Sequence, residues 1–76
     1  MKIDKDQGGG LLLRLGRQLQ AVRKEHNLTQ RDVYQQTGIH AARIERGKVN
    51  LSFTTLLTLC QALGVKMWEV LKALDL

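Results

Sequence analysis

The sequence contains no proline, one cysteine, and a single residue each of tryptophan, tyrosine and phenylalanine. So few aromatic side chains favour a helical core built from leucine, valine and alanine. Cys60 has no partner for an internal disulfide, and one cysteine falls short of any cysteine-based zinc site. We therefore expect neither a disulfide framework nor an oxidising compartment.

Long apolar runs are also absent. No run approaches the 18 residues that a membrane-spanning helix needs. The run 11–13 is too short for the apolar region of a signal peptide, and Arg14 follows it at once. A cytoplasmic location with no membrane partner is expected. At 76 residues and 43% apolar content, the chain is predicted to form one globular domain that a partner subunit would stabilise.

The net charge of +5 is concentrated in one half of the chain. Acidic and basic residues cancel over residues 1–10 and over residues 49–76. The excess therefore lies between Arg14 and Lys48. A basic half beside a neutral half indicates a polyanionic partner, although a basic surface that only maintains solubility gives the same pattern.

Apolar spacing and capping residues predict an all-α fold, a compact five-helix bundle containing a helix-turn-helix. Residues 1–10 end in three glycines and are predicted to be a flexible tail, which leaves residues 11–76 as the domain. Gly16 interrupts the first helix, where it either allows another helix to approach closely or is merely tolerated. Thr29 and Asp32 have the spacing of a capping box. Helices are predicted over about residues 11–25, 30–36, 40–46, 53–63 and 67–74.

Two short helices joined by a turn at Gly38, within a basic bundle, have the plan of a helix-turn-helix. Several blocks of the sequence resemble the lambda-repressor/Cro-like (XRE) helix-turn-helix family, and together they cover about residues 11–74. These blocks are LGRQLQAVR at 15–23, LTQRDV at 28–33, IERGK at 44–48, NLSFTTL at 50–56 and LGV at 63–65.

The chain departs from the family pattern in the recognition segment. The stretch from Gly38 to Glu45 is short by roughly one helical turn. Tyr34 stands where the family has a small alanine, and Leu51 stands where proline is common. We expect a short or displaced recognition helix, with the Tyr34 ring filling the volume of the missing turn.

The resemblance implies DNA contacts from the start of the second helix, from the third helix and from the loop after it. His40, Ala41 and Arg43 begin the recognition helix, whose first side chains reach base edges. Arg43 can pair with guanine and Ala41 can pack on a thymine methyl group, while the contacts outside this helix start are expected mainly at phosphates. A phosphate contact or ion pair for Arg43, and a capping role for His40, are the alternatives. The implied residues are Gln30, Arg31, His40, Ala41, Arg43, Arg46, Lys48 and Asn50.

Two further positions have expected roles. Glu45 would be repelled by phosphates, so it is predicted to pair with Arg31 or Arg43. Trp68 lies beside the apolar stripe of the last helix, and we predict that Trp68, Lys72 and Leu76 form a homodimer contact. A tryptophan folded back over the core is the alternative.

The expected function is a sequence-specific DNA-binding transcriptional regulator, a repressor that binds a palindromic operator as a homodimer. An antitoxin-like protein that binds its own promoter and a protein toxin is the alternative, and a pure protein-interaction module is another. No paired carboxylates, nucleophile triad or phosphate-binding glycine loop is evident, so we do not expect an enzyme. No cofactor or metal is expected.

Overall fold

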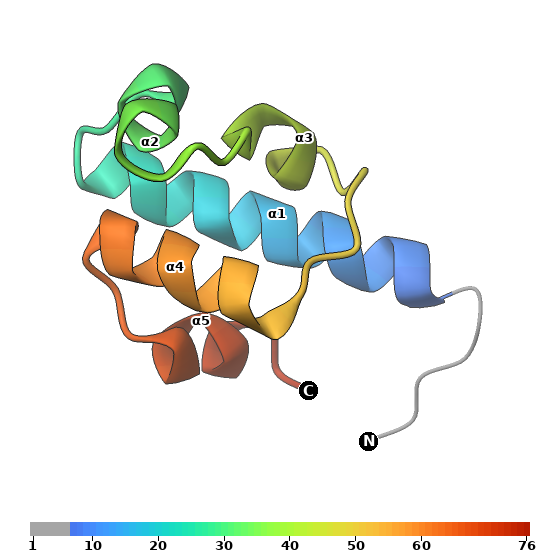
Figure 1. The fold of residues 1–76 in the computed structure, drawn as a ribbon. Coiled ribbons are helices and arrows are strands. Elements are labelled where there is room, and N and C mark those ends of the chain that lie inside the picture. Colours follow the sequence, from blue (N-terminus) through green and yellow to red (C-terminus); the bar gives the residue numbers. More distant parts are fainter. Residues whose placement is uncertain (1–6) are drawn as a thin grey trace.

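The computed structural model describes residues 7–76, with side chains from residue 10 onward. Over this range the chain forms helices only, which confirms the predicted all-α, five-helix architecture (Figure 1). No helix within the described range is both long and apolar enough to cross a membrane. The helices are α1 (Gln7–Glu25), α2 (Gln30–Thr37), α3 (Ala41–Glu45), α4 (Phe53–Leu63) and α5 (Met67–Ala73).

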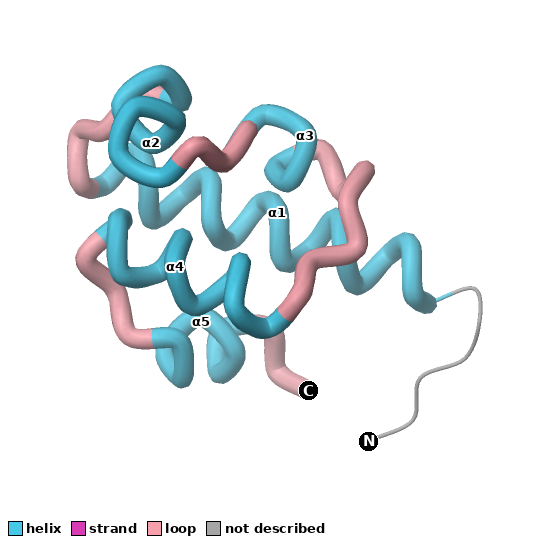
Figure 2. Tube along the Cα trace, viewed as in Figure 1, coloured by secondary structure: helices cyan, strands magenta, loops and turns pink. Residues whose placement is uncertain are grey.

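Helix α1 runs through the middle of the bundle. It packs against α3 on one side and against α4 and α5 on the other, while α2 contacts both α3 and α4. Figure 2 shows the loop at 46–52 that leads from α3 across to α4. Helices α2 and α3 therefore lie together on one side of α1, away from α5 (Figure 1).

The core is aliphatic, as the shortage of aromatic residues predicts. Every helix contributes to it, and α4 contributes the most buried side chains. Cys60 is 1% exposed and is one of these core residues, as expected for a small buried thiol. The buried apolar residues are Leu15, Leu19, Val22, Val33, Ala41, Ile44, Leu56, Leu59, Cys60, Leu63, Val70 and Leu74.

The helix ends agree with the predicted signals, with one large exception. Ser52 caps α4 just before the predicted start of that helix, and Gly64 ends it in the left-handed conformation. Helix α1 begins at Gln7, four residues before the predicted start at Leu11. Glycine is a poor helix former, but extending an existing helix costs little compared with starting one. Residues 7–10 of the predicted tail are therefore helical, and residues 1–6 lie outside the described range.

Two glycines allow α3 to lie directly on the backbone of α1. A Cβ atom built on Gly16 would lie 2.3 Å from the carbonyl oxygen of Ile44, and one built on Gly47 would lie 2.8 Å from the Cα of Leu13. Gly47 also has a φ of 71°, a conformation that glycine adopts without strain. The predicted close approach of a helix at Gly16 is thus confirmed, and that helix is α3.

We predict that Gly16→Ala destabilises the fold by about 1–3 kcal/mol, because the new methyl group must push α3 away from α1. Gly10→Ala is the matched control, since nothing lies within 4 Å of its Cβ position. That change should instead stabilise the helix by about 0.5–1 kcal/mol. Urea unfolding of the two variants measures both effects, and equal effects would contradict the close packing.

Candidate nucleic-acid interface

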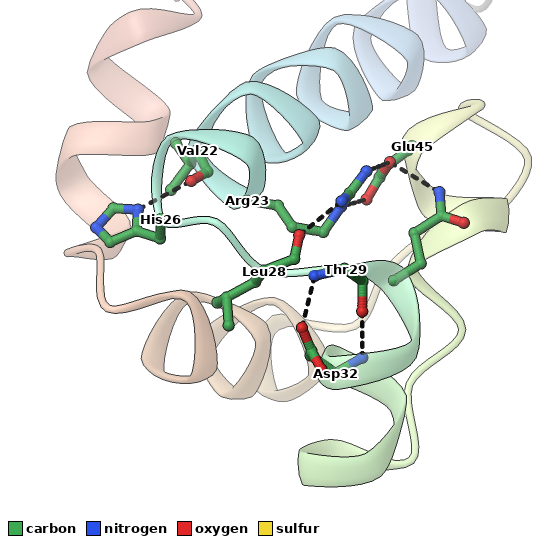
Figure 3. A network of polar contacts seen from close by, with 8 residues as sticks. Val22, Arg23, His26, Leu28, Thr29, Asp32 and Glu45 are labelled. Atoms are coloured by element: carbon green, nitrogen blue, oxygen red, sulfur yellow. Dashed lines mark hydrogen bonds and ion pairs between the residues drawn. The ribbon is translucent and has the colours of Figure 1, made fainter.

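Both ends of helix α2 are fixed by local hydrogen bonds. At its start, the hydroxyl of Thr29 accepts from the backbone N–H of Asp32 at 3.0 Å, and the Asp32 carboxylate accepts from the N–H of Thr29 at 2.8 Å (Figure 3). The bond from the Thr29 N–H lowers the pKa of Asp32 below its ordinary value. At the other end, Gly38 is left-handed and donates its N–H to the carbonyl of Tyr34. The predicted capping box and the predicted turn glycine are confirmed.

Helix α3 is only five residues long, which confirms the predicted short recognition helix. His40 precedes it as the N-cap residue but makes no side-chain capping bond, and Arg46 follows it as the C-cap. Ala41, Ile44 and Glu45 are buried. The exposed surface of the segment consequently comes from His40, Arg43 and Arg46.

A buried ion pair joins α1 to α3. The Nε and Nη2 atoms of Arg23 donate to the two carboxylate oxygens of Glu45 at 2.7 and 3.0 Å (Figure 3). Arg23 also donates from Nη1 to the carbonyl of Leu28, and Gln30 donates its amide to Glu45 at 3.1 Å. Because these four residues come from α1, the following loop, α2 and α3, one network holds the whole helix-turn-helix together.

The network sets the charge states of its members. Burial alone would raise the pKa of Glu45, but hydrogen bonds from Arg23 and Gln30 and the charge of Arg23 outweigh it and lower that pKa below 4.5. The hydrogen bond to Glu45 likewise raises the pKa of Arg23. The predicted partners of Glu45, Arg31 and Arg43, are therefore wrong. The two charges neutralise each other inside the protein, and the arginines near α3 remain exposed.

Three of the predicted DNA-binding residues meet in one open groove of about 460 Å³. His40 and Arg43 line it from the α3 side, and Asn50 lines it from the loop that leads to α4. Ser52 and Thr55 add hydroxyl groups to the same groove. The aliphatic side chains Ile39, Ile44, Val49 and Leu51 also line the groove. The groove is therefore largely apolar, with basic, amide and hydroxyl groups that can donate hydrogen bonds to base edges and phosphates.

The other predicted contact residues do not line this groove. Arg31 and Gln30 are exposed at the start of α2, although the Gln30 amide is engaged with Glu45. Arg46 and Lys48 are exposed beyond the end of α3. Arg14, the first residue of the basic stretch, donates to the carbonyl of Leu74 and is thereby directed toward α5.

Two sequence-based expectations at this surface are wrong. Ala41 is 2% exposed, because it is the residue through which α3 enters the core, so its methyl group cannot reach a thymine. Tyr34 is 47% exposed and does not fill the volume of the missing helical turn. Its ring instead lies against His40, with centroids 4.6 Å apart.

Sequence reasoning did not identify Arg23 as a structural residue of this site. A signal was present, because Arg23 lies four residues after the core residue Leu19 and directly after buried Val22. A cation on the edge of a buried stripe requires a buried anion as its partner. Glu45 is the anion that the structure supplies.

The predicted dimer residues lie at the α5 end of the bundle. Trp68 is 61% exposed, which excludes the alternative of a ring folded over the core, and Leu76 is 56% exposed. The ammonium group of Lys72 lies 5.9 Å from the centroid of the Trp68 ring. This surface is separate from the groove at α3.

The capped α2, the tight turn at Gly38, the short α3 and the exposed basic groups around it define a helix-turn-helix DNA-binding domain. A sequence profile of the Cro/C1-type HTH DNA-binding domain matches residues 18–75, most of the chain. The chain belongs to this family, as the resemblance indicated. A comparison with curated proteins found no match.

We predict that Glu45→Gln lowers the free energy of unfolding at pH 7 by about 3–5 kcal/mol, because it leaves the buried Arg23 charge uncompensated. Folding lowers the pKa of Glu45 below its ordinary value, so the ionised carboxylate stabilises the fold at pH values above that ordinary value. This stabilisation is lost as the pH falls through the folded-state pKa. The difference between wild type and Glu45→Gln should therefore shrink in acid, as urea unfolding at pH 7 and at pH 3 measures.

Glu25→Gln is the matched control, since Glu25 is exposed at the end of α1. This change should alter the stability by less than about 0.5 kcal/mol at either pH. An effect of Glu45→Gln that was small, or equally large at both pH values, would contradict a stabilising ion pair.

Proposed function

We propose that this protein is a transcriptional repressor that binds a palindromic operator as a homodimer. The observation that supports the proposal best is the groove at α3, where His40, Arg43 and Asn50 meet beside the exposed cations Arg46 and Lys48. In a helix-turn-helix, the residues at the start of the recognition helix approach the base edges in the major groove. A bound regulator represses transcription by occupying the promoter.

We assign different tasks to the groups around the groove. The guanidinium of Arg43 donates to the two acceptors on the major-groove edge of guanine. Arg46 and Lys48 neutralise phosphates, which makes binding dependent on salt. Asn50 and Gln30 hydrogen-bond to the phosphate backbone and fix the register of the domain on the duplex.

We propose a homodimer because the surface of α3 that can contact bases is small. A five-residue α3 contacts few base pairs, and two copies double the site while making it palindromic. Trp68, Lys72 and Leu76 are the proposed contact between copies. Trp68 and Leu76 are large exposed apolar side chains, which are enriched where protein surfaces associate.

An antitoxin-like protein is the second candidate. It is favoured by the exposed apolar side chains of α4 and α5, which include Leu57, Trp68 and Leu71. These side chains could contact a toxin as well as a second copy of this chain. The oligomeric state separates the two candidates, because a repressor dimer covers this surface with a second copy. A monomer that binds DNA would favour the antitoxin.

The test of DNA reading begins with selection from a pool of random duplexes at two salt concentrations. We expect an enriched inverted repeat whose half-sites are centred about 34–36 Å apart. Arg43→Ala should then weaken binding to this operator by about 1–3 kcal/mol and relax specificity at one position. Fluorescence anisotropy on the operator and on a scrambled duplex measures both effects.

Lys66→Ala is the charge-matched control, since Lys66 is exposed at the start of α5, away from the groove. It should leave operator affinity close to that of the wild type. An equal loss for Arg43→Ala on the operator and on the scrambled duplex would make Arg43 a phosphate contact. Retention without any enriched motif would contradict sequence-specific reading.

We predict that Trp68→Ala shifts the protein from dimer to monomer in sedimentation equilibrium, because it removes the largest apolar group of the proposed contact. Phe53→Ala is the matched control, since Phe53 is 68% exposed at the start of α4. It should leave the mass unchanged. A dimer that survives Trp68→Ala would remove Trp68 from the interface, and dissociation by Phe53→Ala would move the interface to the start of α4.

A further inference from the structure

Tyr34 and His40 form an aromatic pair on the surface of the helix-turn-helix. Their ring centroids lie 4.6 Å apart, and the ring planes are inclined by 30°. Both residues are exposed, and Tyr34 retains 47% of its accessible surface. A core contact would bury both rings, so this pair does not serve mainly to fill space.

The register of α2 against α3 places this pair at the leading end of α3. Gln30 and Tyr34 are four residues apart and therefore lie on the same face of α2. Gln30 contacts Glu45, the last residue of α3, whereas Tyr34 contacts His40, the residue before its first turn. The Tyr34 ring therefore stands at the end of α3 from which a recognition segment enters the major groove.

The His40 imidazole is not used to cap α3. His40 occupies the N-cap position with φ −84° and ψ 87°, and its side chain makes no capping hydrogen bond. It faces the groove that Arg43 and Asn50 also line. An exposed imidazole without such a bond rotates among several positions, and contact with a neighbouring ring selects one of them.

Because α3 is short, the side chain of His40, which directly precedes it, is important. Three of its five residues are buried, and only Ala42 and Arg43 retain substantial exposure. Few helical side chains are therefore available to read bases. A residue that precedes the helix can add to the reading surface only if its side chain is held in place.

We propose that Tyr34 is a positioning residue that fixes the His40 imidazole for base reading. The ring of Tyr34 supports the imidazole, and an imidazole N–H donates to N7 of a purine in the major groove. The benefit is preorganisation, because the imidazole does not lose its rotational freedom on binding. This inference rests on the proposed DNA-binding function.

The first experiment measures the free protein by NMR. In wild type and in Tyr34→Phe, the ring current of residue 34 should shift the imidazole proton resonances of His40. Tyr34→Ala should return these resonances to the values of an unstructured histidine. Unshifted His40 resonances in the wild type would overturn the positioning role whether or not the protein reads DNA.

The second experiment uses the motif selected by the wild-type protein and a set of its single-base variants. We expect His40→Ala to lose discrimination at one purine position by about tenfold. Tyr34→Ala should lose discrimination at the same position, whereas Tyr34→Phe should retain it. The double variant that combines Tyr34→Ala with His40→Ala should lose no more discrimination than His40→Ala alone. For Tyr34→Ala and Tyr34→Phe, affinity for a scrambled duplex and the melting temperature should remain near those of the wild type.

The outcomes separate this inference from the proposed function. A wild-type protein that selects no motif fails as a sequence-specific regulator, and base reading by His40 fails with it. A wild-type motif that Tyr34→Ala reads as well as the wild type overturns the role of Tyr34 alone. A loss in Tyr34→Phe equal to that in Tyr34→Ala also overturns it, because the hydroxyl and not the stacked ring would then be responsible.

Discussion

The buried ion pair between Arg23 and Glu45 is the constraint on which the DNA-binding half of the molecule depends. The two groups are 8% and 6% exposed, so each needs the other to offset the loss of water. Arg23 also binds the loop carbonyl of Leu28, and Glu45 also binds Gln30. The hydrophobic core includes residues of all five helices and holds them together without regard to direction, whereas this network adds directional bonds between α1, α2 and α3.

The same constraint determines which charges face solvent. Glu45 is the acidic group of α3, and its burial with Arg23 removes a carboxylate from a surface that would otherwise repel phosphates. Arg43, Arg46 and Lys48 then remain as exposed cations within a short stretch of chain. A helix with only five residues can present a basic surface because its one acidic residue points inward.

Local features of the fold could be read from the sequence, and features that depend on distant residues could not. The Thr29–Asp32 capping box and the turn at Gly38 involve residues a few positions apart, and both were predicted correctly. The partner of Glu45 lies 22 positions earlier in the chain, and nearer arginines appeared equally suitable. The burial of Ala41 depends on the rotation of α3 about its axis, which the neighbouring helices set. Resemblance to a family supplied the candidate residues, but this chain's own short α3 decides which side chains reach the surface.

The contact of α3 with α1 through Gly16 and Gly47 has a consequence for how the family can diversify. Because backbone lies on backbone there, α3 lies close to α1, and the Arg23–Glu45 pair completes the contact between the two helices. Its inward residues are few, and its outward residues have no part in holding it. Exchange of the exposed groups can therefore change the chemistry of the α3 surface while the contact with α1 is kept. A domain built in this way separates the residues that set the position of α3 from the residues that present its exposed surface.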